Sequence, residues 1–124
     1  MTDHAKDNAA GWMESISEMV ETLNSTEDQE HDDAYTRINE SVLEIAIRSD
    51  WTTPGVKLKP TEFMLLLTTG GPTLRLRGNL DQYQEPETAY LEYQDWGTPW
   101  AEYFGDNWDS KALLAFASCF YYGD

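Results

Sequence analysis

The spacing of the apolar residues in this chain changes from a helical period to a strand period near residue 42. Over residues 9–24 the apolar side chains recur at helical spacing, which is typical of an amphipathic helix with one buried face. From Val42 to Arg48 apolar and polar residues alternate, which predicts a half-buried strand with Leu43, Ile45 and Ile47 on its inner face. The chain therefore has to combine helix and sheet in one fold.

Four later segments carry further strand signals. Residues 62–68 and 73–77 are strand-like on either side of a Gly-Gly-Pro turn at 69–72, so together they predict a hairpin. Residues 88–95 alternate again and predict another strand. Residues 100–104 predict a short final strand.

Residues 106–122 predict a closing helix, for which Asp106, Asn107 or Asp109 is a suitable N-cap. This helix is apolar on nearly every side, so it is either buried at the centre of the fold or half-covered by a second subunit. The expected fold is α+β, with an N-terminal helix, a three- to four-stranded antiparallel meander sheet and a C-terminal apolar helix.

The length of 124 residues suits one compact domain. Residues 1–33 are predicted to form an acidic helical N-terminal segment and linker, in which 25–33 contains no apolar residue and is expected to be a loop. Residues 34–124 are predicted to form the α+β part of that domain.

Charge is distributed unevenly along the chain, whose formal net charge is −15. Residues 1–33 contain ten acids and one Lys, residues 34–80 contain four acids and six bases, and residues 81–124 contain nine acids and one Lys. A small domain needs a charge of only about 2–8 in magnitude to stay soluble. The excess repels nucleic acid and anionic membranes and attracts basic surfaces, so we expect a basic nucleic-acid-binding protein as partner.

Two groups of residues are candidates for contacting such a partner. The first is a row of carboxylates opposite the apolar face of the first helix, about 21 Å long. The second surrounds the fourth strand and adds two tryptophans, because Trp is enriched in interface hot spots. An ordinary solvated surface is the alternative for both. The first group is Asp7, Glu14, Glu18 and Glu21. The second is Glu85, Glu87, Glu92, Asp95, Trp96, Trp100 and Glu102.

No segment carries a recognisable catalytic or cofactor motif. Cys119 lies in an apolar helix with no base near it in sequence, so it is expected to be a structural thiol. His31-Asp32-Asp33 lacks further donors for a metal ion, and Gly70-Gly71 is followed by a strand where a phosphate loop needs a helix. We therefore expect no enzyme activity, no cofactor and no metal.

The stretch 93–100, Tyr-Gln-Asp-Trp-Gly-Thr-Pro-Trp, resembles a group of small phage and prophage proteins with no established activity. The resemblance extends to Thr-Gly-Gly-Pro at 69–72 and Cys-Phe-Tyr-Tyr-Gly at 119–123, and covers about residues 42–124. In size and charge the chain is also similar to phage anti-restriction and anti-CRISPR proteins, several of which imitate DNA. The single cysteine and the polar N-terminus indicate a cytoplasmic protein, located in the host cytoplasm if it is phage-encoded.

Three functions remain open at this point. The first is a phage-type inhibitor that binds a basic nucleic-acid-handling host defence protein by DNA-like charge mimicry. The second is a non-enzymatic structural or adaptor module that forms a homodimer through the last helix, with acidity serving solubility only. The third is a small hydrolase or sugar-binding protein that uses a carboxylate pair and exposed Trp.

Overall fold

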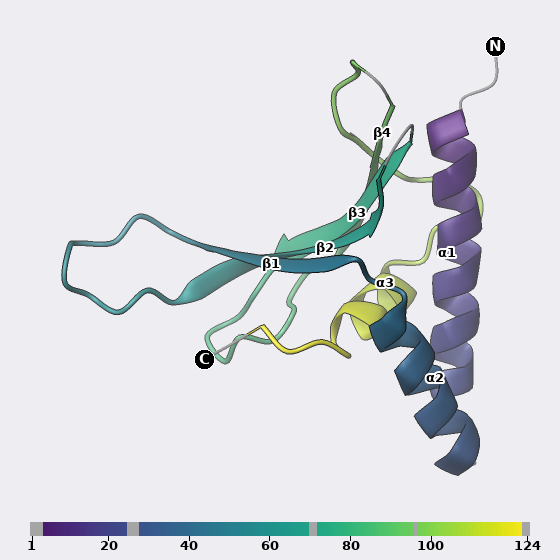
Figure 1. The fold of residues 1–124 in the computed structure, drawn as a ribbon, viewed down its shortest axis with the longest axis horizontal. Coiled ribbons are helices and arrows are strands. Elements are labelled where there is room, and N and C mark those ends of the chain that lie inside the picture. The colour runs from purple at the N-terminus through teal and green to yellow at the C-terminus, as the bar shows by residue number, and fades with distance from the viewer. Residues whose placement is uncertain (1–3, 25–27, 70–71, 96, 123–124) are drawn as a thin grey trace.

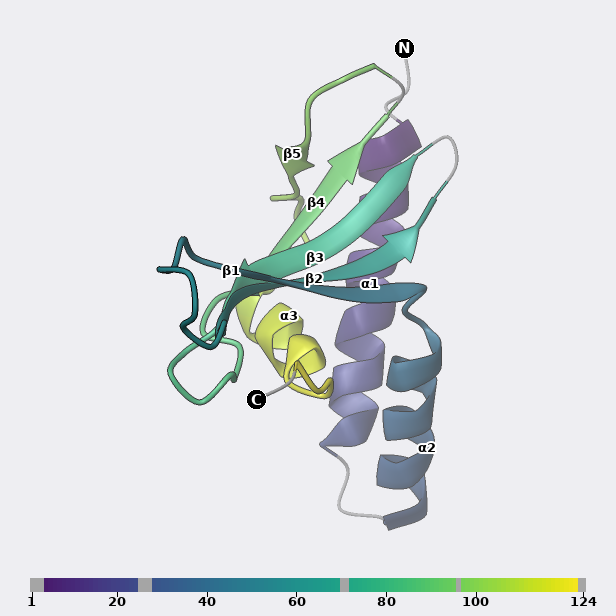
Figure 2. The same ribbon diagram turned by 60° about the vertical axis from the view of Figure 1, so that its left-hand side comes forward.

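The computed structural model describes residues 4–24, 28–69, 72–95 and 97–122 (Figure 1). Three helices and five strands form an α+β fold in which the helices share one side of an antiparallel sheet (Figures 1 and 2). The sheet order β1-β2-β3-β4-β5 follows the chain order. In sequence order the elements are α1 (His4–Leu23), α2 (Asp28–Glu40), β1 (Glu44–Ser49), β2 (Pro60–Thr68), β3 (Thr73–Asn79), β4 (Tyr90–Gln94), β5 (Ala101–Glu102) and α3 (Ser110–Ala117).

The predicted fold class is confirmed, with five strands in place of three to four. Strands β2 and β3 pair antiparallel as expected, and Gly70 and Gly71 of the predicted turn lie outside the described residues. Strand β5 pairs with β4 through Glu102 and Ala101 and is shorter than the predicted segment.

The core lies between the helices and one face of the sheet. Alternate residues of the strands, such as Leu65, Leu76 and Leu91, are fully buried there against apolar residues of α1 and α3. One face of helix α3, with Leu113 and Phe116 completely buried, lies inside the fold, while Leu114 and Ala115 on it are half-buried. Asp109 caps α3 by accepting hydrogen bonds from the backbone N–H of residues 111 and 112.

Helix α2 corrects the prediction that residues 25–33 form a loop. Residues 28–33 are its first two turns, and residues 25–27 lie outside the described part of the chain. The helix is held by Ala34 and Ile38, which are one turn apart and buried against α1. His31 adds a contact, with its Nδ1 2.8 Å from the carbonyl oxygen of Leu23.

Strand β1 is present as predicted, but its expected burial is wrong. Leu43, Ile45 and Ile47 are 63%, 45% and 51% exposed. Ile45 and Ile47 pair with Leu65 and Phe63 of β2, so they belong to the core-side face of the sheet. They are nevertheless exposed because the helices cover the middle strands and leave this edge uncovered (Figure 1).

Within the described ranges, no helix combines the length and the apolar character needed to cross a membrane.

Candidate functional site

The outer face of α1 carries a row of exposed carboxylates. Asp7, Glu14, Glu18 and Glu21 are all exposed, while Met13 and Ile16 on the opposite face are completely buried. The helical period places the acids there because burying the apolar stripe turns them outward. We call these four residues the α1 acidic ridge. Within the described part of the chain, its carboxylates make no ion pair.

The charge density of the ridge is comparable to that of one nucleic-acid strand. Its four carboxylates extend over about 21 Å of helix axis. One strand of duplex DNA carries about six phosphates over that length, and the duplex about twelve. The α1 acidic ridge therefore matches most of the charge of a single strand and only a third of that of a duplex.

Helix α2 brings further acids beside α1, because the two helices pack against each other (Figure 2). Asp32 and Asp33 are exposed on it, and Gln29 donates a hydrogen bond to the Asp33 carboxylate at 3.0 Å. Sequence reasoning missed this contribution because it treated the segment as a linker. The available signal was the spacing of Ala34 and Ile38. In the described residues no group of three or more acids, histidines or cysteines is placed to hold a metal ion.

The second predicted group does not form one acidic surface. Glu85 and Glu87 are exposed in the loop before β4, whereas Asp95 follows the other end of that strand. Glu92 faces the open side of the sheet, where its side chain is only 10% exposed and accepts hydrogen bonds from two arginines. We therefore remove Glu92 from the candidate contacts. Trp96 lies outside the described residues.

The arginines of β3 are neutralised within the chain. The Nε atoms of Arg75 and Arg77 lie 2.7 Å and 2.8 Å from the same Glu92 Oε1. Trp100 packs against Arg75, whose guanidinium carbon lies 3.9 Å from the ring centroid. This predicted hot-spot tryptophan therefore holds an internal contact. The hydrogen bond to Glu92 raises the pKa of Arg77, with burial opposing it, so that guanidinium keeps its charge.

Glu102 lies opposite Glu92 across β4 and β5. Burial, reinforced by the nearby charge of Glu92 and partly offset by Arg77, raises the pKa of the Glu102 carboxyl above its usual range. A carboxylate pair with one raised pKa is also what a glycosidase needs. In this pair, however, Glu92 is already occupied by two guanidinium groups, which leaves it unsuited to attack a sugar or activate water.

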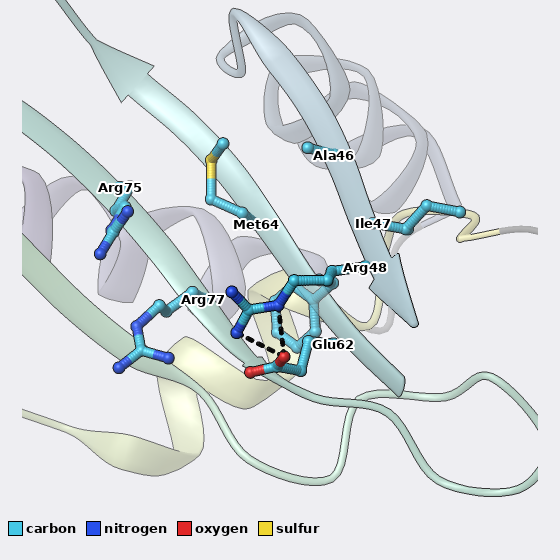
Figure 3. Close-up of a pocket in the computed structure, with 8 residues that line it drawn as sticks. Ala46, Ile47, Arg48, Glu62, Met64, Arg75 and Arg77 are labelled. Atoms are coloured by element: carbon cyan, nitrogen blue, oxygen red, sulfur yellow. Dashed lines mark hydrogen bonds and ion pairs between the residues drawn. The ribbon is translucent and has the colours of Figure 1, made fainter. Parts of the chain in front are cut away.

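A groove of about 400 Å³ runs over the open face of the sheet between β1 and β3 (Figure 3). The side chains of Arg48, Arg75 and Arg77 border the groove. Met64, on the intervening strand β2, also lines it. Arg48 is bound to Glu62, with Nε–Oε2 at 2.6 Å and Nη2–Oε2 at 2.5 Å. Three of the eight bases of the chain are therefore paired with carboxylates on this face, which leaves the α1 acidic ridge without compensation from them.

Cys119 has the environment of a structural thiol. Its Sγ lies 3.5 Å from the Ala115 carbonyl oxygen, and burial raises its pKa. A raised thiol pKa reduces the fraction of nucleophilic thiolate at neutral pH. Its surroundings therefore do not favour nucleophilic catalysis.

No match emerges from comparisons of this chain with protein family models, curated proteins and solved structures.

Proposed function

We propose that this protein is a small acidic inhibitor of the phage type that binds a basic, nucleic-acid-handling host defence protein by charge mimicry in the host cytoplasm. The observation that carries the proposal is the α1 acidic ridge, which is exposed and forms no ion pair with the residues that the structure describes, while Arg75 and Arg77 are paired with Glu92. A site that binds phosphates holds several Lys and Arg in fixed positions. A rigid row of carboxylates can contact those Lys and Arg side chains in place of phosphates, and such contacts do not depend on nucleotide sequence.

The density of the ridge makes the proposal more specific. Four carboxylates along about 21 Å suit a channel that holds one strand, or one backbone of a duplex. The overall charge of −15 favours rapid encounter with a basic target at low salt. Membranes and nucleic acids are disfavoured as partners because they are anionic themselves.

The test is a pull-down from nuclease-treated host lysate with the tagged full chain, at low and high salt, followed by mass spectrometry. We expect a basic nucleic-acid-binding protein that is released at high salt. Once it is identified, single-stranded DNA should compete for it, because both ligands use the same cations.

The matched variants separate the ridge from general acidity. Glu18→Lys/Glu21→Lys reverses two charges of the ridge, the same number as in the control, and should strongly weaken capture, with circular dichroism unchanged because both side chains are exposed. Glu85→Lys/Glu87→Lys reverses two exposed acids elsewhere and should retain it. Equal loss in both variants would show that only net charge matters, and retention in both would refute mimicry by the ridge.

A further inference from the structure

Strand β1 forms an open edge of the sheet with an apolar row beside it. It pairs with β2 on one side, and no described strand pairs with its other side. An edge strand of this kind offers unpaired N–H and C=O groups to another chain. Leu43, Ile45 and Ile47 lie along it at about half exposure or more, on the face that is otherwise the core side. The opposite edge, β5, has only two residues.

The sequence of β1 is complementary to itself when two copies run antiparallel. Residues 44–48 read Glu-Ile-Ala-Ile-Arg, which is symmetric about Ala46 in polarity and opposite in charge at its ends. If Ala46 faces Ala46 of a second copy, Ile45 faces Ile47, and Glu44 faces Arg48. Cross-strand pairs of these two kinds stabilise antiparallel sheets. Glu44 makes no ion pair in the described part of its own chain.

The charge near β1 permits two copies to approach. Residues 44–62 contain three acids and three bases, so this hairpin is neutral in a chain of net charge −15. It also extends away from α1, which carries the acidic ridge (Figure 1). Contact through β1 therefore avoids the repulsion that two copies would experience through their helices.

The loop that follows β1 also exposes apolar side chains. Trp51 is fully exposed, and Val56 and Leu58 are 57% and 61% exposed. With the apolar row of β1, these six side chains expose on the order of 500 Å². The backbone edge adds to this value, which approaches the roughly 800 Å² per partner of a standard interface.

We propose that this protein forms a two-fold symmetric homodimer in which β1 pairs antiparallel with β1 of a second copy about Ala46. The two five-stranded sheets join into one continuous sheet, with Ile45–Ile47 contacts on one face. On the other face Arg48 keeps its ion pair with Glu62 of its own chain and takes Glu44 of the second copy as a second carboxylate. Such an interface is isologous, because the same patch serves both copies. Both α1 acidic ridges remain exposed, so dimerisation holds whether or not the ridge binds a basic partner.

Sedimentation velocity of the full chain at increasing concentration tests the association. We expect a species of twice the 14.2 kDa monomer mass, with a dissociation constant on the order of 10 µM or below. Ile47→Lys should raise that constant at least about tenfold, because it places two lysines in an apolar contact. The control is Tyr83→Lys, a change of similar kind at a 72% exposed side chain outside β1, which should leave the dimer intact.

A charge-swapped pair of variants tests the register. Glu44→Arg alone places Arg opposite Arg48. Arg48→Glu, combined with Glu62→Gln so that no carboxylate pair arises within the chain, places Glu opposite Glu44. Each should be predominantly monomeric. When the two variants are mixed, every Arg faces a Glu and a heterodimer should form, measurable by energy transfer between two dyes. Circular dichroism of each variant confirms that it is folded.

The proposal fails if the wild type stays monomeric to about 100 µM, in which case the edge is open to a different chain. It also fails if Ile47→Lys leaves the dimer unchanged, which would place the interface elsewhere. If the two charge variants do not associate on mixing, the Ala46-centred register is wrong.

Discussion

At the scale of the residue, Glu92 determines how the open face of the sheet holds its positive charge. Its nearly buried carboxylate binds both Arg75 and Arg77. The alternation along β3 places these two arginines on the face opposite the buried Leu74 and Leu76. Sequence reasoning could not distinguish Glu92 from the exposed Glu85 and Glu87, because the ion pairs depend on the register between β3 and β4.

Replacement of Glu92 should therefore be costly. Glu92→Gln removes the charge shared by two adjacent guanidinium groups, and we expect the free energy of unfolding to fall by about 2 kcal/mol or more. Urea denaturation followed by circular dichroism measures the change. Glu87→Gln, at an exposed carboxylate, should stay within about 0.5 kcal/mol of wild type. Equal effects of the two substitutions would contradict the role given to Glu92.

Glu102 should make stability depend on pH in the opposite sense to a salt-bridged carboxylate. Between the ordinary carboxyl pKa of the unfolded chain and the raised pKa of the folded chain, Glu102 is still protonated in the folded chain and already ionised in the unfolded chain. The free energy of unfolding therefore falls as the pH rises from the ordinary carboxyl range through the raised pKa. Glu102→Gln should abolish this loss and be at least as stable as wild type at neutral pH.

Urea denaturation across the pH range measures this effect. Below about pH 4 the two proteins should converge, because Glu102 is then protonated in both the folded and the unfolded chain. A stability difference between Glu102→Gln and wild type that stays constant with pH would rule out the proposed cause.

At the scale of the element, predictions succeeded where burial imposed a period and failed where it did not. Helix α1 and strands β2 to β4 each bury an apolar face, so their spacing was informative. Among the side chains of helix α2 that the structure describes, Ala34 and Ile38 are the buried ones. Two apolar positions among many acids do not make a recognisable apolar stripe. Strand β1 has the pattern of a buried strand, but how far the helices extend over the sheet is a tertiary property that spacing does not encode.

The sparse packing of α2 has a measurable consequence. Ile38→Ala removes its largest buried side chain, and we expect α2 to detach before the rest of the molecule unfolds, because little else holds it on α1. Amide hydrogen exchange should then show protection lost over residues 28–40 and retained in β2 and β3. Thr36→Ala, at an exposed position of the same helix, is the control. Uniform loss of protection would show that α2 unfolds together with the sheet.

At the scale of the whole molecule, the net charge of −15 acts against the compact state. Added salt screens that repulsion, so the Tm should rise between about 20 mM and 500 mM NaCl. The neutralised variant Asp7→Asn/Glu14→Gln/Glu18→Gln/Glu21→Gln lacks the α1 acidic ridge and should show a smaller rise. A Tm that falls with salt would mean that attractive ion pairs outweigh the repulsion.

The neighbour-to-neighbour order of the sheet has a consequence for how the chain folds. Each strand pairs with the strand before it in sequence. Formation of the sheet during folding therefore requires only short segments of chain to close into loops. Helix α1 instead packs on α3 and β4, and Asn107 donates a hydrogen bond to the carbonyl oxygen of Ala10, 97 positions away. We expect α1 to dock after the rate-limiting step. In stopped-flow experiments Ile16→Val should then speed unfolding and leave refolding unchanged, and slower refolding would show that docking comes earlier. On the ribosome, α1 can pair with α2, which follows it directly, but it meets α3 only after the whole sheet has been made.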